Sequence, residues 1–269
     1  MHALAAEAAA LLGRAPVRVV PLHGGDLSDV LRLTFSDGST AIVKSGPAPE
    51  IEASMLRAIR NSGASAPKVL ACNKKALVMQ DLPETGGLSD QAWGDLGSQL
   101  RCLHATTGRR YGWEVDYAFG QVSIRNRWHD DWPAFWAENR LLADLAELPR
   151  RLHTPLEQIA TALPGLLPAS PPASLLHGDL WTGNVMADGP RLSALIDPAC
   201  YFGHGEVDLA MLELFGQPAP AFWRQYGPPR DGWPIRRAVY QLWPAIVHLR
   251  LFGLSYLSLA ERLIAQIPV

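Results

Sequence analysis

Two carboxylates and one amide follow two apolar segments in the second half of the chain, in a spacing suited to phosphoryl transfer. Asp179 follows Leu175 and Leu176, Asn184 comes five residues later, and Asp197 ends a second apolar run. In such a set, one carboxylate orients a hydroxyl and accepts its proton, while the amide and the other carboxylate hold Mg²⁺ against ATP phosphates. We therefore predict Asp179 as the catalytic base and Asn184 and Asp197 as magnesium ligands. The alternative is that the aspartates only begin turns, where Asp is common.

Lys44 is the second candidate, because it ends the apolar run 41–43 in a pattern close to V-A-I-K. In that pattern the lysine contacts ATP phosphates and pairs with a glutamate of the next helix. We favour Glu52 as the partner, since it shares a helix face with Met55. Glu50 is the competing choice, and a solvated strand end is the plain alternative for Lys44.

Two further segments are candidates for nucleotide contact. Gly24 and Gly25 lie between the first two expected strands, where backbone N–H groups can cover phosphates. Met79, Gln80 and Leu82 end the last expected strand of this region and are predicted to offer backbone groups to adenine. The competing interpretations are an ordinary hairpin and an ordinary buried strand.

The elements that must position these residues change character after residue 82. Apolar and β-branched runs before this point predict strands, joined by glycine and Asp-Gly turns, with helices at the N-terminus and over 49–61. Beyond it, helical spacing dominates. We therefore predict an α+β, bilobal fold with a sheet lobe, 1–82, and a mainly helical lobe, 83–269. The expected strands are 17–20, 29–35, 40–44, 68–71 and 76–79; the later helices are 89–104, 132–147, 153–163, 206–215 and 235–267, the last interrupted at 243–244.

Composition excludes several classes of protein. The 269 residues carry 24 Lys and Arg against 26 Asp and Glu, so no basic excess favours nucleic-acid binding. No apolar run approaches the length of a membrane span. Three cysteines without a C-x-x-C pair make a disulfide framework or zinc cluster unexpected and favour a reducing, cytoplasmic location. Nothing in the sequence specifies an oligomeric state.

Three segments together resemble one family. H-G-D-L-W-T-G-N at 177–184, I-D-P-A-C-Y-F-G-H-G-E-V-D at 196–208 and N-R-W-H-D-D-W-P-A-F-W at 126–136 are similar to the fructosamine kinase (ketosamine kinase) family. That family belongs to the protein-kinase-like superfamily, with the aminoglycoside and choline phosphotransferases. The resemblance implies a bilobal fold and ATP-dependent phosphorylation of a sugar hydroxyl, typically O3 of a fructosyl-amine. The acceptor would be a small ketosamine or a glycated amine of a protein side chain.

The third segment belongs to a tryptophan-rich stretch, which gives it a possible place in the acceptor site. Sugars bind well against aromatic faces rimmed by carboxylates and amides. The competing interpretation is that aromatic residues at 132, 135 and 136 face the core, since a helix buries such a spacing. His204, Glu206 and Asp208 are expected to orient the catalytic loop. The candidate acceptor contacts are Asn126, Trp128, Asp131, Trp132 and, beside the catalytic Asp, Trp181.

Two other functions stay open on the sequence. One is an O-phosphotransferase of the same fold with an amino-sugar or amino-alcohol acceptor. The other is a catalytically silent nucleotide-binding module, which the joint presence of Lys44, Asp179, Asn184 and Asp197 disfavours.

Overall fold

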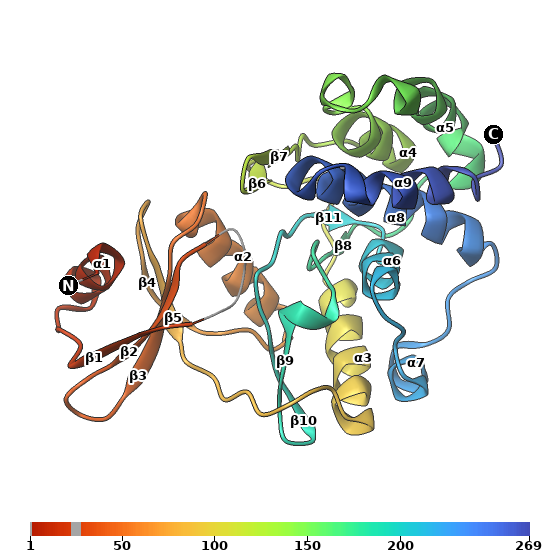
Figure 1. Cartoon of the computed structure of the whole chain (residues 1–269). Coiled ribbons are helices and arrows are strands. Elements are labelled where there is room, and N and C mark those ends of the chain that lie inside the picture. Colours follow the sequence, from red (N-terminus) through yellow and green to blue (C-terminus); the bar gives the residue numbers. More distant parts are fainter. Residues whose placement is uncertain (1, 23–27) are drawn as a thin grey trace.

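A five-stranded antiparallel sheet forms the N-terminal lobe of the computed structural model, which describes residues 2–22 and 28–269 (Figure 1). The strand order is β1-β2-β3-β5-β4. Every neighbouring pair is antiparallel, as expected for strands joined by short turns. The strands lie close to the positions that the sequence predicts: β1 (Arg18–Pro21), β2 (Val30–Thr34), β3 (Thr40–Lys44), β4 (Val69–Cys72) and β5 (Leu77–Gln80).

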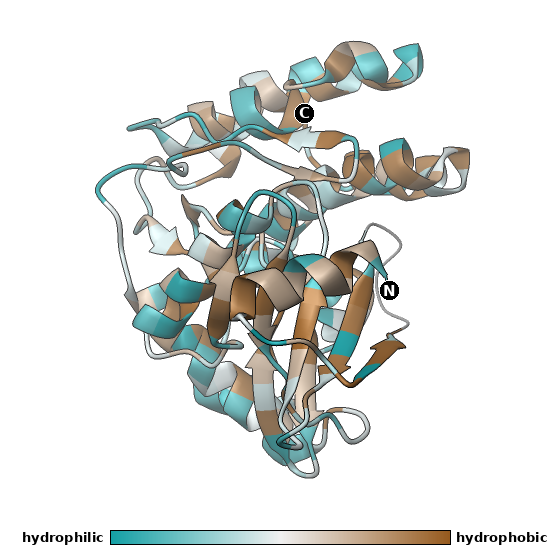
Figure 2. Cartoon of the chain, turned by 90° about the vertical axis from the view of Figure 1, so that its left-hand side faces the viewer, coloured by the Kyte–Doolittle hydropathy of each residue, from teal (hydrophilic) through white to brown (hydrophobic). Residues whose placement is uncertain are grey.

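The two faces of this sheet are covered by different helices, α1 (Ala3–Leu12) and α2 (Pro49–Asn61). Figure 2 shows α1 lying across the strands. Along β3, Ala41 and Val43 pack with α1, whereas Ile42 belongs to the larger core on the other face. Because side chains alternate along a strand, Lys44 falls on the same face as Ile42. This alternation turns the lysine away from α1 and toward α2.

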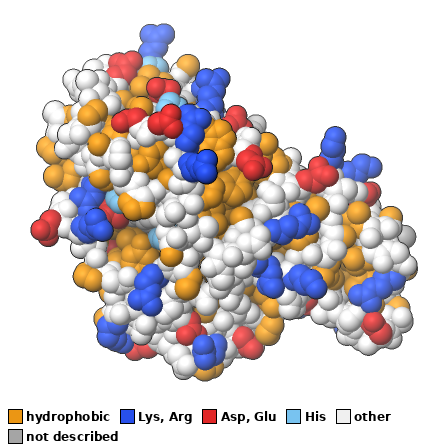
Figure 3. Space-filling view, turned by 180° about the vertical axis from the view of Figure 1, so that it is seen from behind, with side chains coloured by type: hydrophobic (Ala, Val, Ile, Leu, Met, Phe, Trp, Pro, Cys, Tyr) orange, Lys and Arg blue, Asp and Glu red, His pale blue; other side chains and the backbone are white. Residues whose placement is uncertain are grey.

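The C-terminal lobe is mainly helical, and a narrower waist joins it to the sheet lobe in the space-filling view (Figure 3). Its short strands form three two-stranded pairs: β6 (Tyr117–Phe119) with β7 (Val122–Ile124), β8 (Ser174–Leu175) with β11 (Phe202–Gly203), and β9 (Val185–Asp188) with β10 (Arg191–Leu195). No described helix has the length and apolar character needed to cross a membrane. The helices are α3 (Asp90–Ala105), α4 (Trp132–Trp136), α5 (His153–Leu166), α6 (Glu206–Leu214), α7 (Pro220–Tyr226), α8 (Trp233–Phe252) and α9 (Leu257–Ile264).

The last helical region differs from the sequence prediction. The predicted interruption at 243–244 does not occur, because α8 continues through Pro244 and ends before Gly253, whose φ is 83°. Residues 240–247 are all buried, so tertiary packing compensates for the hydrogen bond that Pro244 cannot donate. The helix expected over 132–147 is also shorter: α4 continues as one π-helical turn and ends at Leu141.

Candidate functional site

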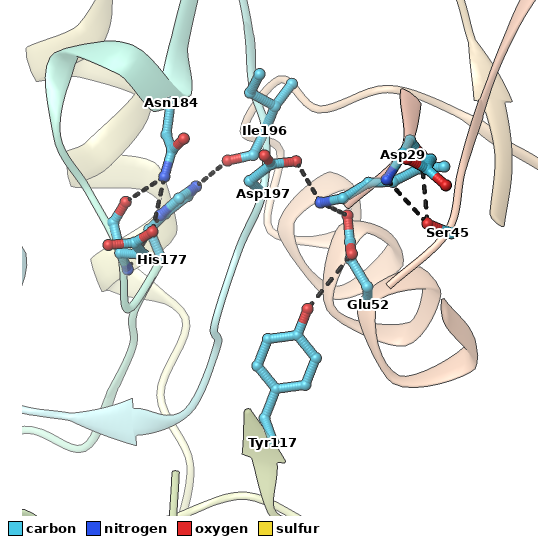
Figure 4. A network of polar contacts seen from close by, with 10 residues as sticks. Asp29, Ser45, Glu52, Tyr117, His177, Asn184, Ile196 and Asp197 are labelled. Atoms are coloured by element: carbon cyan, nitrogen blue, oxygen red, sulfur yellow. Dashed lines mark hydrogen bonds and ion pairs between the residues drawn. The ribbon is translucent and has the colours of Figure 1, made fainter. Parts of the chain in front are cut away.

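Lys44 is held between two carboxylates from different parts of the chain, those of Glu52 and Asp197, both labelled in Figure 4. Its Nζ lies 3.0 Å from Oε1 of Glu52 on α2 and 2.8 Å from Oδ1 of Asp197, which follows β10. The hydroxyl of Tyr117 on β6 donates to the other oxygen of Glu52 at 3.3 Å. The structure therefore pairs Lys44 with Glu52, while Glu50 is exposed.

The charge on Lys44 is retained despite its burial. Burial by itself lowers the pKa of this ammonium, but the carboxylates of Glu52 and Asp197 outweigh that effect and raise its pKa above the ordinary value. The Lys44 side chain is 9% exposed and that of Glu52 is 3% exposed, whereas that of Asp197 is 37% exposed. The triad thus presents a fixed positive charge beside a partly open carboxylate.

Asp179 and Asn184 lie against each other across one short 3₁₀ turn, residues 182–184. The Asn184 Nδ2 donates to the backbone oxygen of Asp179 at 2.8 Å and to its Oδ2 at 3.0 Å. Since the amide nitrogen faces Asp179, the carbonyl oxygen is the atom directed elsewhere. Burial raises the pKa of Asp179 to about 7; the Asn184 hydrogen bond opposes this rise and the Asp197 charge adds to it.

The backbone around these residues requires glycine at one position and is strained at another. Gly178 has φ 84°, and a Cβ on it would lie 2.0 Å from the carbonyl oxygen of Ala199. Asp197 has φ 53°, the only positive φ of a non-glycine residue in the described chain. Ala199 donates its N–H to the His177 carbonyl at 2.9 Å, so the two loops touch directly. Such strain persists only where surrounding contacts hold it, and it is characteristic of functional sites.

Asp208 on α6 holds the loop that carries Asp179. Its two oxygens accept the backbone N–H groups of His177 at 2.7 Å and of Gly178 at 2.9 Å. His104 on α3 contributes a third hydrogen bond, from Nε2 to Oδ2 at 3.0 Å, and its Nδ1 lies 2.8 Å from the Tyr226 hydroxyl. Burial alone would raise the pKa of Asp208, but the hydrogen bond and charge of His104 lower it. The carboxylate therefore acts as an ionised anchor for the catalytic loop.

The other two residues expected to orient this loop have different partners. His204 Nδ1 lies 2.8 Å from the Tyr240 hydroxyl. Glu206 forms a two-point ion pair with Arg236, with N–O distances of 2.6 and 2.7 Å. Among the three predicted orienting residues, only Asp208 contacts the loop through a hydrogen bond.

A cavity of about 440 Å³ opens beside these polar groups. Its volume lies within the range of sites that enclose a small ligand. Trp181, 40% exposed, contributes to the lining, and its contact with an acceptor stays a prediction. The lining includes four charged or amide side chains and nine side chains with rings: Lys44, Asp179, Asn184 and Asp197, and Tyr117, Phe119, Trp181, Phe215, Tyr240, Trp243, His248, Phe252 and Tyr256.

The structure does not bring the other four predicted acceptor contacts to this cavity. Trp132 is fully buried and donates its Nε1–H to Tyr240, as its helical spacing with residues 135 and 136 favours. Asp131 caps α4 by accepting the Ala134 N–H at 2.8 Å. The remaining two also have partners away from the cavity: Asn126 is buried and hydrogen-bonded to Arg140, and Trp128 stacks on Phe202.

Three of the predicted nucleotide-contact residues lie in or just after β5, the strand that pairs with β3 and β4. Met79 is buried in β5, Gln80 is exposed at its end, and Leu82 lies in the following extended segment, partly buried. None of the three lines the cavity of Asp179. Gly24 and Gly25 lie outside the described residues.

Several residues of the site were not found from the sequence. Tyr117 lies on a three-residue strand, too short for a clear alternating pattern. His248, Phe252 and Tyr256 do carry a usable signal, since residues four apart share one face of a helix. Phe215 joins them only through tertiary packing, at 5.0 Å between its ring centroid and that of His248.

Known proteins share the sequence pattern and the fold of this chain. A family model described as fructosamine kinase matches residues 15–268. The chain belongs to the fructosamine kinase family. A "probable ketoamine kinase" of Synechocystis sp. is 36% identical over 193 residues, which cover 68% of this chain and 64% of that protein. The aligned part thus spans just under two thirds of that relative.

Solved structures extend the similarity to the whole fold. A Thermobifida fusca protein described as a "putative fructosamine-3-kinase" superposes with a TM-score of 0.89 at 29% identity, covering 99% of this chain and 98% of that one. A complex of an amicoumacin kinase with AMP-PNP and Ca²⁺ has a TM-score of 0.66 at 16% identity, covering 97% and 91%. The family member therefore has a kinase-like bilobal fold.

Proposed function

We propose that this member of the family transfers a phosphoryl group from ATP to a sugar hydroxyl of a ketosamine, a small molecule or a glycated amine of a protein side chain. The observation that carries the proposal is the convergence of Lys44, Asp179, Asn184 and Asp197 on one cavity. Phosphoryl transfer depends chiefly on positioning and on charge stabilisation, and these four residues supply both. The ketoamine named for the Synechocystis relative supports the choice of acceptor.

The polar residues have distinct roles in this reaction. Asp179 accepts the proton of the attacking hydroxyl, and its pKa of about 7 suits a base that works near neutral pH. Lys44, kept charged by its carboxylate partners, binds phosphate oxygens. Glu52 fixes the lysine in place, with Tyr117 donating to its second oxygen. We assign residues 1–82 to ATP binding and 83–269 to catalysis and acceptor binding.

Asn184 and Asp197 form a donor set suited to Mg²⁺. The metal prefers oxygen ligands and is held in kinases by one or two side chains together with substrate phosphates. The Asn184 amide nitrogen is engaged by Asp179, so its oxygen is the available donor, and Asp197 is partly open to the cavity. When bound, the metal would neutralise phosphate charge.

The proposed setting is a reducing cytoplasm. The three cysteines all lie in described segments and form no disulfide. Cys102 is exposed as a thiol, which fits a compartment that keeps thiols reduced.

The direct test is ADP release with Mg·ATP and either fructosyl-lysine or ribulosyl-lysine, with ³¹P NMR to locate the new phosphate. Asp179→Asn should lower kcat by about 10² to 10⁴, the usual contribution of a positioned base. Asp90→Asn, an exposed carboxylate in the first turn of α3, is the matched control and should retain activity. Phosphorylation of amino sugars or amino alcohols alone would contradict the acceptor, and full activity in Asp179→Asn would contradict the assigned base.

A further inference from the structure

Four rings form one continuous surface in the cavity of Asp179, and we call it the aromatic groove: Phe215, His248, Phe252 and Tyr256. The centroid of His248 lies 5.0 Å from those of Phe215 and Tyr256 and 5.5 Å from that of Phe252. The centroids of Phe252 and Tyr256 are 5.8 Å apart. These distances are those of rings in contact, so the groove is one surface.

The groove is built where two helical segments end. Phe215 follows the last residue of α6, while His248 and Phe252 lie in the last turns of α8 and Tyr256 in the short 3₁₀ turn after it. Phe215 and Phe252 remain 45% and 43% exposed. Apolar rings left open beside catalytic carboxylates mark a surface that gains free energy when a ligand covers it.

The groove is uncharged, unlike the other end of the cavity. The carboxylates among the described lining residues are Asp179 and Asp197, and both lie at the catalytic end. His248 donates its Nδ1–H to the Pro244 carbonyl at 2.7 Å, which leaves Nε2 as an acceptor. Burial also lowers the pKa of His248, so the ring is neutral near pH 7. An anionic ligand group would lose its hydration here without gaining a cationic partner among the described residues of the groove.

These features divide the cavity in a way that matches the parts of a ketosamine. Such an acceptor joins a sugar to a basic nitrogen, and the nitrogen carries a further substituent. The ammonium is only a few bonds away from the sugar hydroxyl, so a hydroxyl placed at Asp179 keeps the ammonium near the carboxylates of Asp179 and Asp197. The substituent on the nitrogen must then continue along the cavity. We infer that the aromatic groove binds an uncharged, apolar substituent on the amine nitrogen of the acceptor, an alkyl chain or ring. The inference rests on the proposed function and adds the part of the acceptor that the enzyme selects.

A series of N-fructosyl alkylamines tests this inference, with methyl, propyl and pentyl groups on nitrogen. Burial of a methylene contributes about 0.8 kcal/mol, so kcat/KM should rise about fourfold for each methylene that enters the groove. The fructosyl derivative of 5-aminopentanoate has a comparable chain ending in a carboxylate, and its kcat/KM should be at least about tenfold below that of the pentyl compound. A kcat/KM that does not change with chain length, or that is higher for the carboxylate compound, would overturn the inference.

Calorimetric titration with the same compounds separates this inference from the proposed function, because binding needs no turnover. Binding that tightens with chain length while no phosphate is transferred would contradict the proposed function and support binding of the substituent in the groove. Phosphorylation that is independent of chain length would do the reverse.

Variants of the two exposed rings locate the effect in the groove. Phe252→Ser should lower the pentyl-to-methyl ratio of kcat/KM by about tenfold, and Phe215→Ser provides a second, independent removal of a ring. Leu254→Ser is the control, since Leu254 is 70% exposed on the neighbouring turn and does not line this cavity. A ratio that is unchanged in both ring variants, or reduced equally in Leu254→Ser, would show that the substituent binds elsewhere.

Discussion

Replacing Asp179 with Asn should remove activity and at the same time stabilise the folded chain above neutral pH. Burial raises the pKa of this carboxyl from its ordinary value of 3.8 to about 7. Between these two values the folded chain keeps the proton that the unfolded chain has released. The folded state then binds more protons, so the free energy of unfolding falls as the pH rises through this window. Asn cannot ionise and escapes this loss.

The size of the gain follows from the pKa shift and from the contacts of Asp179. A rise of about three pKa units corresponds to about 4 kcal/mol once the group is fully ionised in both states. This value is an upper bound, because Asp179 lines an open cavity where water screens its charge, and the opposing hydrogen bond from Asn184 is already included in the pKa of about 7. We expect a net gain of about 1–2 kcal/mol at pH 8 and a smaller one at pH 5.

Urea unfolding followed by tryptophan fluorescence measures both values, and the midpoint is interpreted only where the slope is unchanged. Glu157→Gln removes an exposed carboxylate of α5 and serves as the control, with no gain expected at either pH. A variant Asp179→Asn that is less stable than the parent at pH 8, or that gains equally at pH 5, would refute the argument that ionised Asp179 is destabilising.

Three further substitutions test the supports of the site. Gly178→Ala should cost about 2 kcal/mol or more of stability and reduce kcat on the order of 100-fold, because its Cβ would overlap a backbone carbonyl. A variant with the activity of the parent would contradict this expectation. His104→Ala should lower kcat about tenfold with KM for ATP unchanged, whereas His104→Gln keeps a donor to Asp208 and should recover much of the rate. An equal loss of rate in both variants would argue against a role of His104 in positioning the catalytic loop through Asp208. Lys44→Met should lower the free energy of unfolding by about 3–5 kcal/mol, because it leaves the buried Glu52 carboxylate unpaired. Adding Glu52→Gln should restore stability, measured by thermal or urea unfolding, but not activity. A double variant as unstable as the single one would refute the argument that the unpaired carboxylate is the cause.

The polar part of the site could be predicted because its spacing is fixed locally. One 3₁₀ turn returns Asn184 to Asp179, so their separation in the sequence determines their separation in space. The face of β3 on which Lys44 lies follows from the alternation of strand side chains, and Glu52 follows from the helix face. Similar reasoning placed the five strands of the sheet lobe, whose turns and apolar runs are local features.

The end of the cavity that we propose for the acceptor could not be predicted by the same means, because it is assembled from distant segments. Its rings come from the β6-β7 hairpin, from the end of α6 and from the last turns of α8. The tryptophan segment was the more conspicuous feature in the sequence, yet Trp132 is fully buried and bonded to Tyr240. A helical spacing of aromatic residues indicates a buried face, but it does not say whether that face meets the core or a cavity.

The two ends of the cavity should differ in how well they tolerate substitution. The catalytic end depends on a strained φ at Asp197 and on a glycine at 178 that admits no Cβ, so most substitutions there disturb both folding and chemistry. The groove depends on partly exposed rings at helix ends, where replacing Phe215 or Phe252 removes less buried area than replacing a fully buried core residue. Substitutions in the groove should therefore alter KM for the acceptor with small effects on stability. We therefore expect selectivity for the amine substituent to vary within this fold while Lys44, Asp179, Asn184 and Asp197 stay fixed.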